Sequence, residues 1–137
     1  MPRVAAVLET CLYAQDLERA ATFYEDLFGW TPIFSDARLR AYGVAPASVF
    51  LLFESGGTRE DVVTPEGTIP AHDGIPGGHA AFAIAAEDWE AWLERLAGRG
   101  IAVESTVRWP RGGQSVYFRD PGGNLIELAT PGLWAVY

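Results

Sequence analysis

The chain repeats one pattern of secondary structure, and this repeat restricts the fold more than any other feature of the sequence. In the first half, a strand-like run at residues 5–14 precedes a helical pattern that begins after Asp16 and ends at Gly29. In the second half, a strand at residues 78–84 precedes a helix at residues 87–97. Three strand-like runs follow each helix: 31–35, 38–44 and 48–54, then 102–109, 114–119 and 125–130. Because one such unit cannot bury its own sheet face, the sequence predicts two βαβββ modules that pair with each other.

A segment without periodicity separates the two halves. Residues 55–77 are rich in Gly, Pro and Thr and show neither strand alternation nor helical spacing. We therefore expect a single domain over residues 1–137, with module 1 at 1–54, a connecting loop at 55–77, module 2 at 78–130 and a tail at 131–137. A loop of this length and composition is typical of a mobile segment that closes over or beside a binding cleft.

Composition excludes several classes of function. The net charge of −8 argues against binding to nucleic acid or to an anionic membrane surface. All ten basic residues are Arg, which excludes lysine Schiff-base chemistry and a lysine-based phosphate loop. Cys11 is the single cysteine, so no disulfide or cysteine metal cluster can form, and we interpret it as a small buried residue. No apolar run is long enough for a signal peptide or a membrane span, and we expect a cytoplasmic protein.

Glu127 interrupts an apolar strand. Its neighbours are Leu125, Ile126 and Leu128, so the strand should be mostly buried. An uncompensated buried carboxylate is costly, so an Arg, a hydrogen-bond network or a metal ion must accompany it. The sequence leaves all three open, with Arg108 and Arg119 as the candidate cationic partners.

The repeat places polar residues at equivalent positions. His79 stands in the second copy where Glu9 stands in the first, and Glu127 stands where Leu51 does. Strand alternation turns Glu9, His79 and Glu127 toward one open face, where three such ligands suit a divalent metal ion. Each also has an ordinary interpretation: a solvated strand residue, a core histidine bonded to a carbonyl, and an Arg-paired carboxylate. His72 is a weaker candidate, because an exposed loop histidine is the usual explanation.

Four segments resemble the vicinal oxygen chelate superfamily: residues 12–19, 23–29, 78–82 and 117–128. This superfamily includes glyoxalase I, extradiol dioxygenases, fosfomycin-resistance thiol transferases, methylmalonyl-CoA epimerase and bleomycin-resistance proteins. The resemblance implies an α+β fold in which two βαβββ modules form a U-shaped cleft around a divalent metal ion. The family's ligand positions correspond to Glu9, His79 and Glu127 of this chain.

The ligand set departs from the named members. Glyoxalases have a fourth ligand where this chain has Leu51, and dioxygenases and thiol transferases have His where it has Glu9. Two carboxylates and a neutral imidazole bring a divalent ion to net zero charge, which favours Mn²⁺, Fe²⁺ or Mg²⁺, with Zn²⁺ or Ni²⁺ possible. Because the arginines are scattered, we expect a small, largely uncharged or aromatic substrate.

Two functions of different class follow from these features. The first is a metal-dependent lyase, isomerase or oxygenase that acts on a substrate with vicinal oxygens, with Glu9 or Glu127 as a candidate base. The second is a bleomycin-resistance-like protein that sequesters an antibiotic or other aromatic compound without turnover. The aromatic residues that could line such a cleft are Trp30, Phe53, Trp109, Tyr117 and Trp134. Small members of the family pair, often with module exchange, so we expect a homodimer with sites shared between chains.

Overall fold

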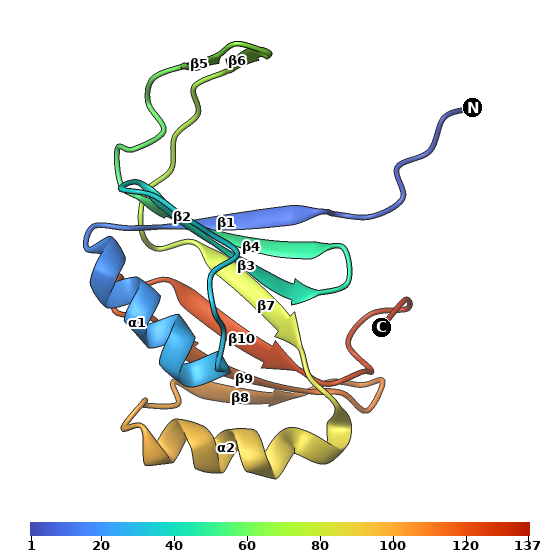
Figure 1. Ribbon diagram of the computed structural model, residues 1–137. Helices are drawn as coiled ribbons and strands as arrows, with labels where there is room; N and C mark the ends of the chain where they lie inside the picture. The colour runs from blue at the N-terminus through green and yellow to red at the C-terminus, as the bar shows by residue number, and fades with distance from the viewer. The chain divides into compact units, whose positions relative to one another are not determined.

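The computed structural model describes residues 1–137, and the chain folds as two compact units, residues 1–76 and 77–137 (Figure 1). Each unit contains a four-stranded sheet, with strand order β1-β4-β3-β2 in the first and β7-β10-β9-β8 in the second. The two predicted βαβββ modules and the α+β class are therefore confirmed. The division into one domain with a loop and a tail stays a prediction.

The first unit forms its helix between well-defined caps. Its elements are β1 Glu9–Ala14, α1 Leu17–Phe28, β2 Phe34–Ser35, β3 Leu39–Ala45 and β4 Ser48–Glu54. The Asp16 side chain accepts a hydrogen bond from the N–H of Arg19 at 3.0 Å, and Gly29 ends the helix with a φ of 71°. The apolar face of α1 packs on the sheet, where the rings of Tyr24 and Phe50 lie 5.0 Å apart. Both predicted ends of this helix are confirmed.

The second unit repeats this order. Its elements are β7 His79–Ala83, the 3-10 turn η1 Ala86–Asp88, α2 Trp89–Gly98, β8 Ser105–Arg108, β9 Gln114–Arg119 and β10 Leu125–Ala129. Along β7, Ala80 and Phe82 are buried, whereas His79, Ala81 and Ala83 are exposed. The predicted alternation of this strand is confirmed. Neither α1 nor α2 has the length and hydropathy of a membrane-spanning helix.

The first and last strands of each βαβββ module are parallel neighbours with the same register. The aligned pairs are Glu9 with Val49 and Cys11 with Leu51 in one sheet, and His79 with Leu125 and Ala81 with Glu127 in the other. His79 is therefore the structural equivalent of Glu9, and Glu127 is the equivalent of Leu51. The sequence alignment of the two halves had the same equivalences.

The first strand is shorter than the sequence predicted. It begins at Glu9 rather than at residue 5, because β4 starts at Ser48 and offers residues 5–7 no partner. Leu8, which precedes this strand, does not join the core, since 59% of it is exposed. Tyr13 alternates along the strand with Glu9 and Cys11 but, unlike them, is buried.

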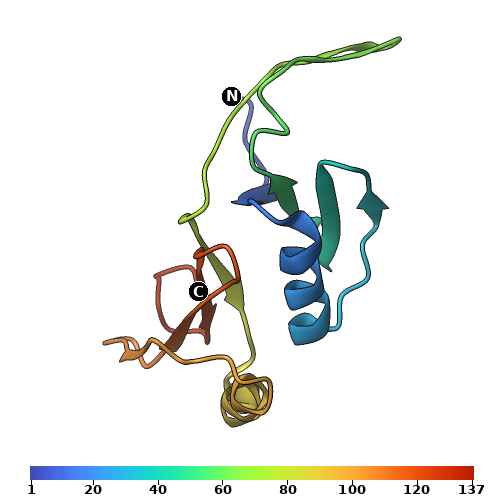
Figure 2. The ribbon, with the colours of Figure 1, turned by 90° about the vertical axis from the view of Figure 1, so that its left-hand side faces the viewer.

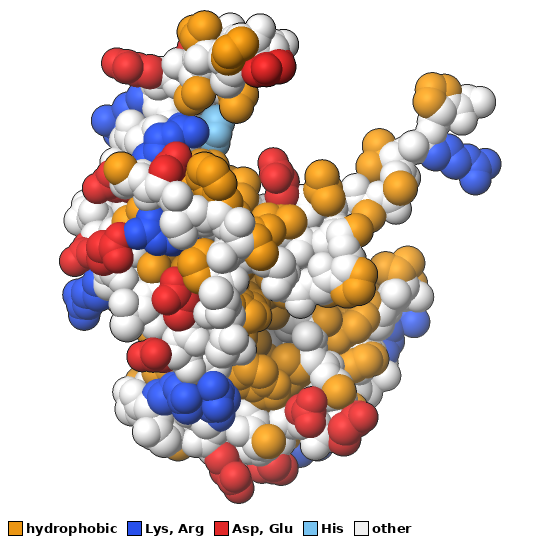
Figure 3. Space-filling view, viewed as in Figure 1, with side chains coloured by type: hydrophobic (Ala, Val, Ile, Leu, Met, Phe, Trp, Pro, Cys, Tyr) orange, Lys and Arg blue, Asp and Glu red, His pale blue; other side chains and the backbone are white.

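The connecting segment contains a hairpin that the sequence analysis did not predict. Strands β5 Val62–Thr64 and β6 Gly67–Ile69 pair around a two-residue turn, and Figure 2 shows them as an extended two-stranded arm. The β-branched residues flanking the turn explain this pairing, although the strands are too short to give a clear pattern. Apolar side chains are exposed on the arm (Figure 3), among them Val63 at 79% and Ile69 at 55%.

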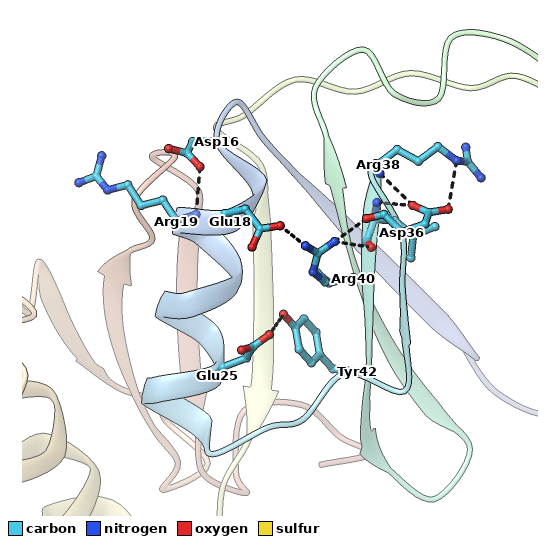
Figure 4. A network of polar contacts seen from close by, with 9 residues as sticks. Asp16, Glu18, Arg19, Glu25, Asp36, Arg38, Arg40 and Tyr42 are labelled. Carbon is cyan, nitrogen blue, oxygen red and sulfur yellow. Dashed lines mark hydrogen bonds and ion pairs between the residues drawn. The ribbon is translucent and has the colours of Figure 1, made fainter.

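Polar contacts attach α1 to strand β3 (Figure 4). The hydroxyl of Tyr42, a fully buried residue, donates to Glu25 Oε1 at 3.0 Å, and Arg40 pairs with Glu18. Burial, and then the hydrogen bond and negative charge of Glu25, raise the pKa of Tyr42 well above its ordinary value of 10.0. The phenol therefore stays protonated and continues to donate at neutral pH.

Tyr42→Phe should lower the free energy of unfolding by about 1 kcal/mol, the net value of one hydrogen bond. A raised pKa in the folded state gives stability that is present below the ordinary value of 10.0 and is lost as pH rises above it. The variant should therefore show a smaller alkaline loss of stability than the natural sequence. Urea unfolding between about pH 8 and about pH 11 measures both effects.

Glu25→Gln is the matched control, because its amide oxygen still accepts from Tyr42 and less stability should be lost. An equal alkaline decrease in the natural protein and Tyr42→Phe would contradict the assignment.

Candidate metal centre

The turn between β9 and β10 fixes the position of β7. Asn124 is fully buried, and its Oδ1 accepts hydrogen bonds from the backbone N–H groups of residues 77–78 at 2.8 and 3.0 Å. Asp120 in turn accepts from the backbone N–H and Nδ2 of Asn124, at 2.9 and 2.8 Å. These bonds hold His79, the first residue of β7, beside Leu125 at the start of β10.

His79 and Glu127 meet on one face of the second sheet. The His79 Nε2 atom lies 3.2 Å from Glu127 Oε2, and His79 Nδ1 lies 2.9 Å from the carbonyl oxygen of Leu125. Only 5% of Glu127 is exposed, whereas the His79 side chain is 47% exposed. A buried carboxylate and a solvent-accessible imidazole are thus brought together at the surface of one unit.

A hydrogen-bond network compensates the buried carboxylate. Ser115 donates from Oγ to Glu127 Oε1 at 2.5 Å and accepts from Trp109 Nε1 at 2.8 Å. Burial, and then the charge of Glu127, raise the pKa of Tyr117, whose hydroxyl also contacts this carboxylate. Arg119, one of the two candidate cationic partners, pairs with Glu104 at 2.8 Å instead.

The direction of these hydrogen bonds defines a place for one positive charge. A carbonyl oxygen can only accept, so the bond to Leu125 requires that His79 Nδ1 carries a proton. Nε2 then directs a lone pair at Glu127 Oε2, and the two acceptors repel unless a proton or a metal ion lies between them. An imidazole nitrogen whose other N–H is held by a carbonyl, next to a hydrogen-bonded carboxylate, fits a divalent metal ion.

The His79–Glu127 pair lies in a cavity of about 280 Å³. The lining residues are His79, Ala81, Trp109, Tyr117, Glu127, Leu133 and Trp134. The C-terminal segment supplies Trp134, which is 71% exposed, and Tyr137 fastens this segment by donating to the carbonyl oxygen of Ala129 at 2.8 Å. The lining contains no Lys or Arg, so the cavity favours uncharged, apolar occupants.

Glu9 lies in the first unit, in a different set of contacts. It lines two cavities of about 180 and 200 Å³ together with Phe53 and His72. The Tyr13 hydroxyl lies 2.8 Å from both Thr58 Oγ1 and His72 Nδ1. His72 is therefore an exposed loop residue whose ring contacts the Tyr13 hydroxyl. Its sequence offers no signal for this, because the contact joins residues 59 positions apart.

Two further sequence interpretations have a structural outcome. Cys11 is exposed, so the interpretation as a buried residue is wrong. Partial burial and the charge of Glu9 raise the pKa of the Cys11 thiol, which disfavours a nucleophilic thiolate. Trp30 is half-buried, and its ring stacks on that of Phe28 at a distance of 4.3 Å.

The structure brings together two of the three predicted ligands. His79 and Glu127 are adjacent, and Trp109, Tyr117 and Trp134 line their cavity. In neither unit do three His, Cys, Asp or Glu side chains gather as metal ligands. The complete set with Glu9 stays a prediction.

Replacing Glu127 by Gln should lower the pKa of Tyr117 toward its ordinary value of 10.0, because the nearby negative charge disfavours the phenolate. The Tyr117 pKa should stay somewhat above its ordinary value, because burial of the phenol also raises it. Alkaline titration of carbon-13-labelled tyrosine by NMR measures this, with Tyr117→Phe identifying the signal. Glu94→Gln, an exposed change in α2, is the control, and an unchanged Tyr117 pKa in Glu127→Gln would refute the contact.

Comparisons with known proteins identify relatives over most of the chain. A glyoxylase-like domain-containing protein of Didymella fabae is 34% identical over 119 residues, which cover 85% of this chain and 87% of that protein. Metallothiol transferase FosB of Staphylococcus epidermidis is 24% identical, over 93% of this chain and 82% of that protein. The crystal structure of lactoylglutathione lyase from Agrobacterium tumefaciens has a TM-score of 0.87 and 32% identity, over 98% of this chain and 99% of that chain.

The family assignment agrees with the fold. Residues 5–128 match the model of one family, and this range includes both βαβββ modules. The chain therefore belongs to the glyoxalase/bleomycin resistance protein/dioxygenase superfamily.

Proposed function

We propose that this protein is a metal-dependent enzyme that acts on a small molecule with two vicinal oxygen atoms, as a lyase, isomerase or oxygenase. The observation that carries the proposal is the contact of His79 Nε2 with Glu127 Oε2 at 3.2 Å inside an open cavity. The other polar atom of each side chain already has a hydrogen-bond partner. His79 Nδ1 contacts the Leu125 carbonyl oxygen, and Glu127 Oε1 accepts from Ser115. A relative named as a metallothiol transferase supports metal-assisted chemistry, and one named as a lactoylglutathione lyase supports lyase chemistry on this fold.

His79 and Glu127 would hold the ion, and Glu9 is the proposed third ligand. With two carboxylates and one imidazole the site is neutral, which favours Mn²⁺, Fe²⁺ or Mg²⁺ and permits Zn²⁺ or Ni²⁺. Such an ion, when bound, supplies Lewis acidity toward substrate oxygens. Glu9 or Glu127 is the proposed base for proton abstraction.

The cavity walls would select and orient the substrate. Trp109, Trp134 and Leu133 offer apolar surfaces, and the lining has no cation for a phosphonate or a carboxylate. The raised pKa of Tyr117 keeps its hydroxyl protonated, so this group can donate a hydrogen bond. A small, uncharged substrate with a planar apolar part fits these properties.

The aromatic lining also favours a second candidate function. A cavity with Trp109, Tyr117 and Trp134 could sequester an aromatic antibiotic or a similar compound without turnover. Binding of such a compound with equal affinity in the presence and absence of metal would favour this alternative. Metal-dependent turnover would favour the enzyme.

Assembly is a further part of the proposal. We propose a cytoplasmic homodimer whose sites are shared between chains, because strands β1 and β7 each leave one edge unpaired in their own sheets. Light scattering at micromolar concentration should report a dimer, and a monomer there would contradict this part.

Metal titration tests the ligand set. His79→Ala should weaken Mn²⁺ binding by more than about 100-fold, since it removes the only nitrogen ligand, whereas loss of an outer partner typically costs about 10- to 100-fold. Glu127→Gln should weaken binding while the fold is kept, because its amide relieves the buried charge. Glu9→Gln should lower affinity if Glu9 is a ligand and change nothing if it is a solvated strand residue.

Calorimetric titration of Mn²⁺ and Zn²⁺ into protein prepared without nickel or chelator is the measurement. The matched controls are His72→Ala, which replaces the other histidine, and Glu94→Gln, an exposed carboxylate. Unaltered affinity in both His79→Ala and Glu9→Gln would overturn the metal site and leave the sequestering protein as the better explanation.

A further inference from the structure

Trp109, Ser115 and Glu127 are joined by a chain of hydrogen bonds, which simple lining of a cavity would not require. Tyr117 in β9 is the residue directly opposite Glu127. Ser115 is fully buried and lies two residues before Tyr117, on the same face of the strand. The Ser115 hydroxyl therefore reaches Glu127 diagonally across the two strands, at 2.5 Å. Trp109 approaches the same hydroxyl from beyond the end of β8, with its Nε1 at 2.8 Å.

The chemistry of these groups allows only one direction for the chain of hydrogen bonds. An indole N–H can donate but cannot accept, so Ser115 Oγ accepts from Trp109. The single hydroxyl proton of Ser115 is then directed at Glu127 Oε1. This occupies Oε1 and leaves Oε2 as the oxygen that faces His79 Nε2.

We propose that Trp109 and Ser115 are positioning residues that hold the Glu127 carboxylate with Oε2 turned toward His79, and so set the affinity of the metal site. This inference rests on the proposed function, because it presumes that Glu127 binds the ion. Trp109 then has two roles: its ring lines the cavity, and its N–H orients the Glu127 carboxylate through Ser115. Partners that orient a metal-binding carboxylate typically contribute about 10- to 100-fold in affinity.

Two substitutions separate the positioning role from the packing role. Ser115→Ala removes the donor to Glu127 and should weaken Mn²⁺ binding by about 10- to 100-fold. Trp109→Phe keeps an aromatic ring but removes the N–H, so the Ser115 hydroxyl is free to rotate and binding should weaken by about 10-fold. Ser105→Ala, an exposed change in β8, and Trp92→Phe in α2 are the controls outside the cavity.

A double-mutant cycle provides the readout that a merely structural role would not give. If Trp109 acts through Ser115, the combined variant should bind Mn²⁺ no more weakly than Ser115→Ala alone. Ser115→Thr keeps the hydroxyl and should recover most of the affinity. Mn²⁺ binding is followed by the loss of the free-ion signal in electron paramagnetic resonance, and thermal unfolding of each variant shows that it is folded.

The outcomes distinguish the inference from the proposed function. Natural protein that binds Mn²⁺, with losses in Ser115→Ala and Trp109→Phe that do not add, supports the positioning role. Natural affinity in both variants overturns the positioning role and leaves the metal site intact. Losses in free energy of binding that add fully in the double variant have the same meaning. If Ser115→Ala does not fold, Trp109→Phe and Ser115→Thr decide by the same criteria. Absence of Mn²⁺ binding by the natural protein, or unaltered affinity in both His79→Ala and Glu9→Gln, overturns the proposed function and the inference together.

Discussion

In each βαβββ module the last strand lies parallel beside the first, and the candidate site depends on this pairing. Parallel neighbours cannot be joined by a tight turn, so the helix and the other two strands of the module connect them along the chain. In the second unit this pairing aligns His79 with Leu125, which puts the imidazole within reach of Glu127. A slip of one residue would turn Glu127 to the opposite face. The buried amide of Asn124, bonded to residues 77–78, holds the register.

The same register recurs in the first unit with different chemistry. Leu51 occupies the position of Glu127, and Glu9 occupies the position of His79. The first unit therefore offers one carboxylate where the second offers a histidine and a carboxylate. The repeated βαβββ topology accounts for the shared geometry, whereas the side chains at the equivalent positions account for the difference in polar groups.

Burial of Glu127 determines the character of its surroundings. A carboxylate that is 5% exposed requires donors, and Ser115 provides one at 2.5 Å without adding charge. Because that donor is neutral, the negative charge remains available to a cation at His79. The cavity outside the pair is apolar, so the charge is concentrated where the chemistry would occur. This lining underlies the proposed preference for a small, uncharged substrate.

The sequence by itself determined the modules, the helix ends at Asp16 and Gly29, and the need of Glu127 for compensation. These features follow from local periodicity and from neighbours in the chain, which act over a few residues. Only the tertiary structure decided what meets Glu127, because Ser115 lies 12 positions away and Trp109 reaches it through Ser115. His72 likewise gained its partner from a residue 59 positions distant. Side-chain contacts across strands depend on register and packing, which one strand's pattern does not encode.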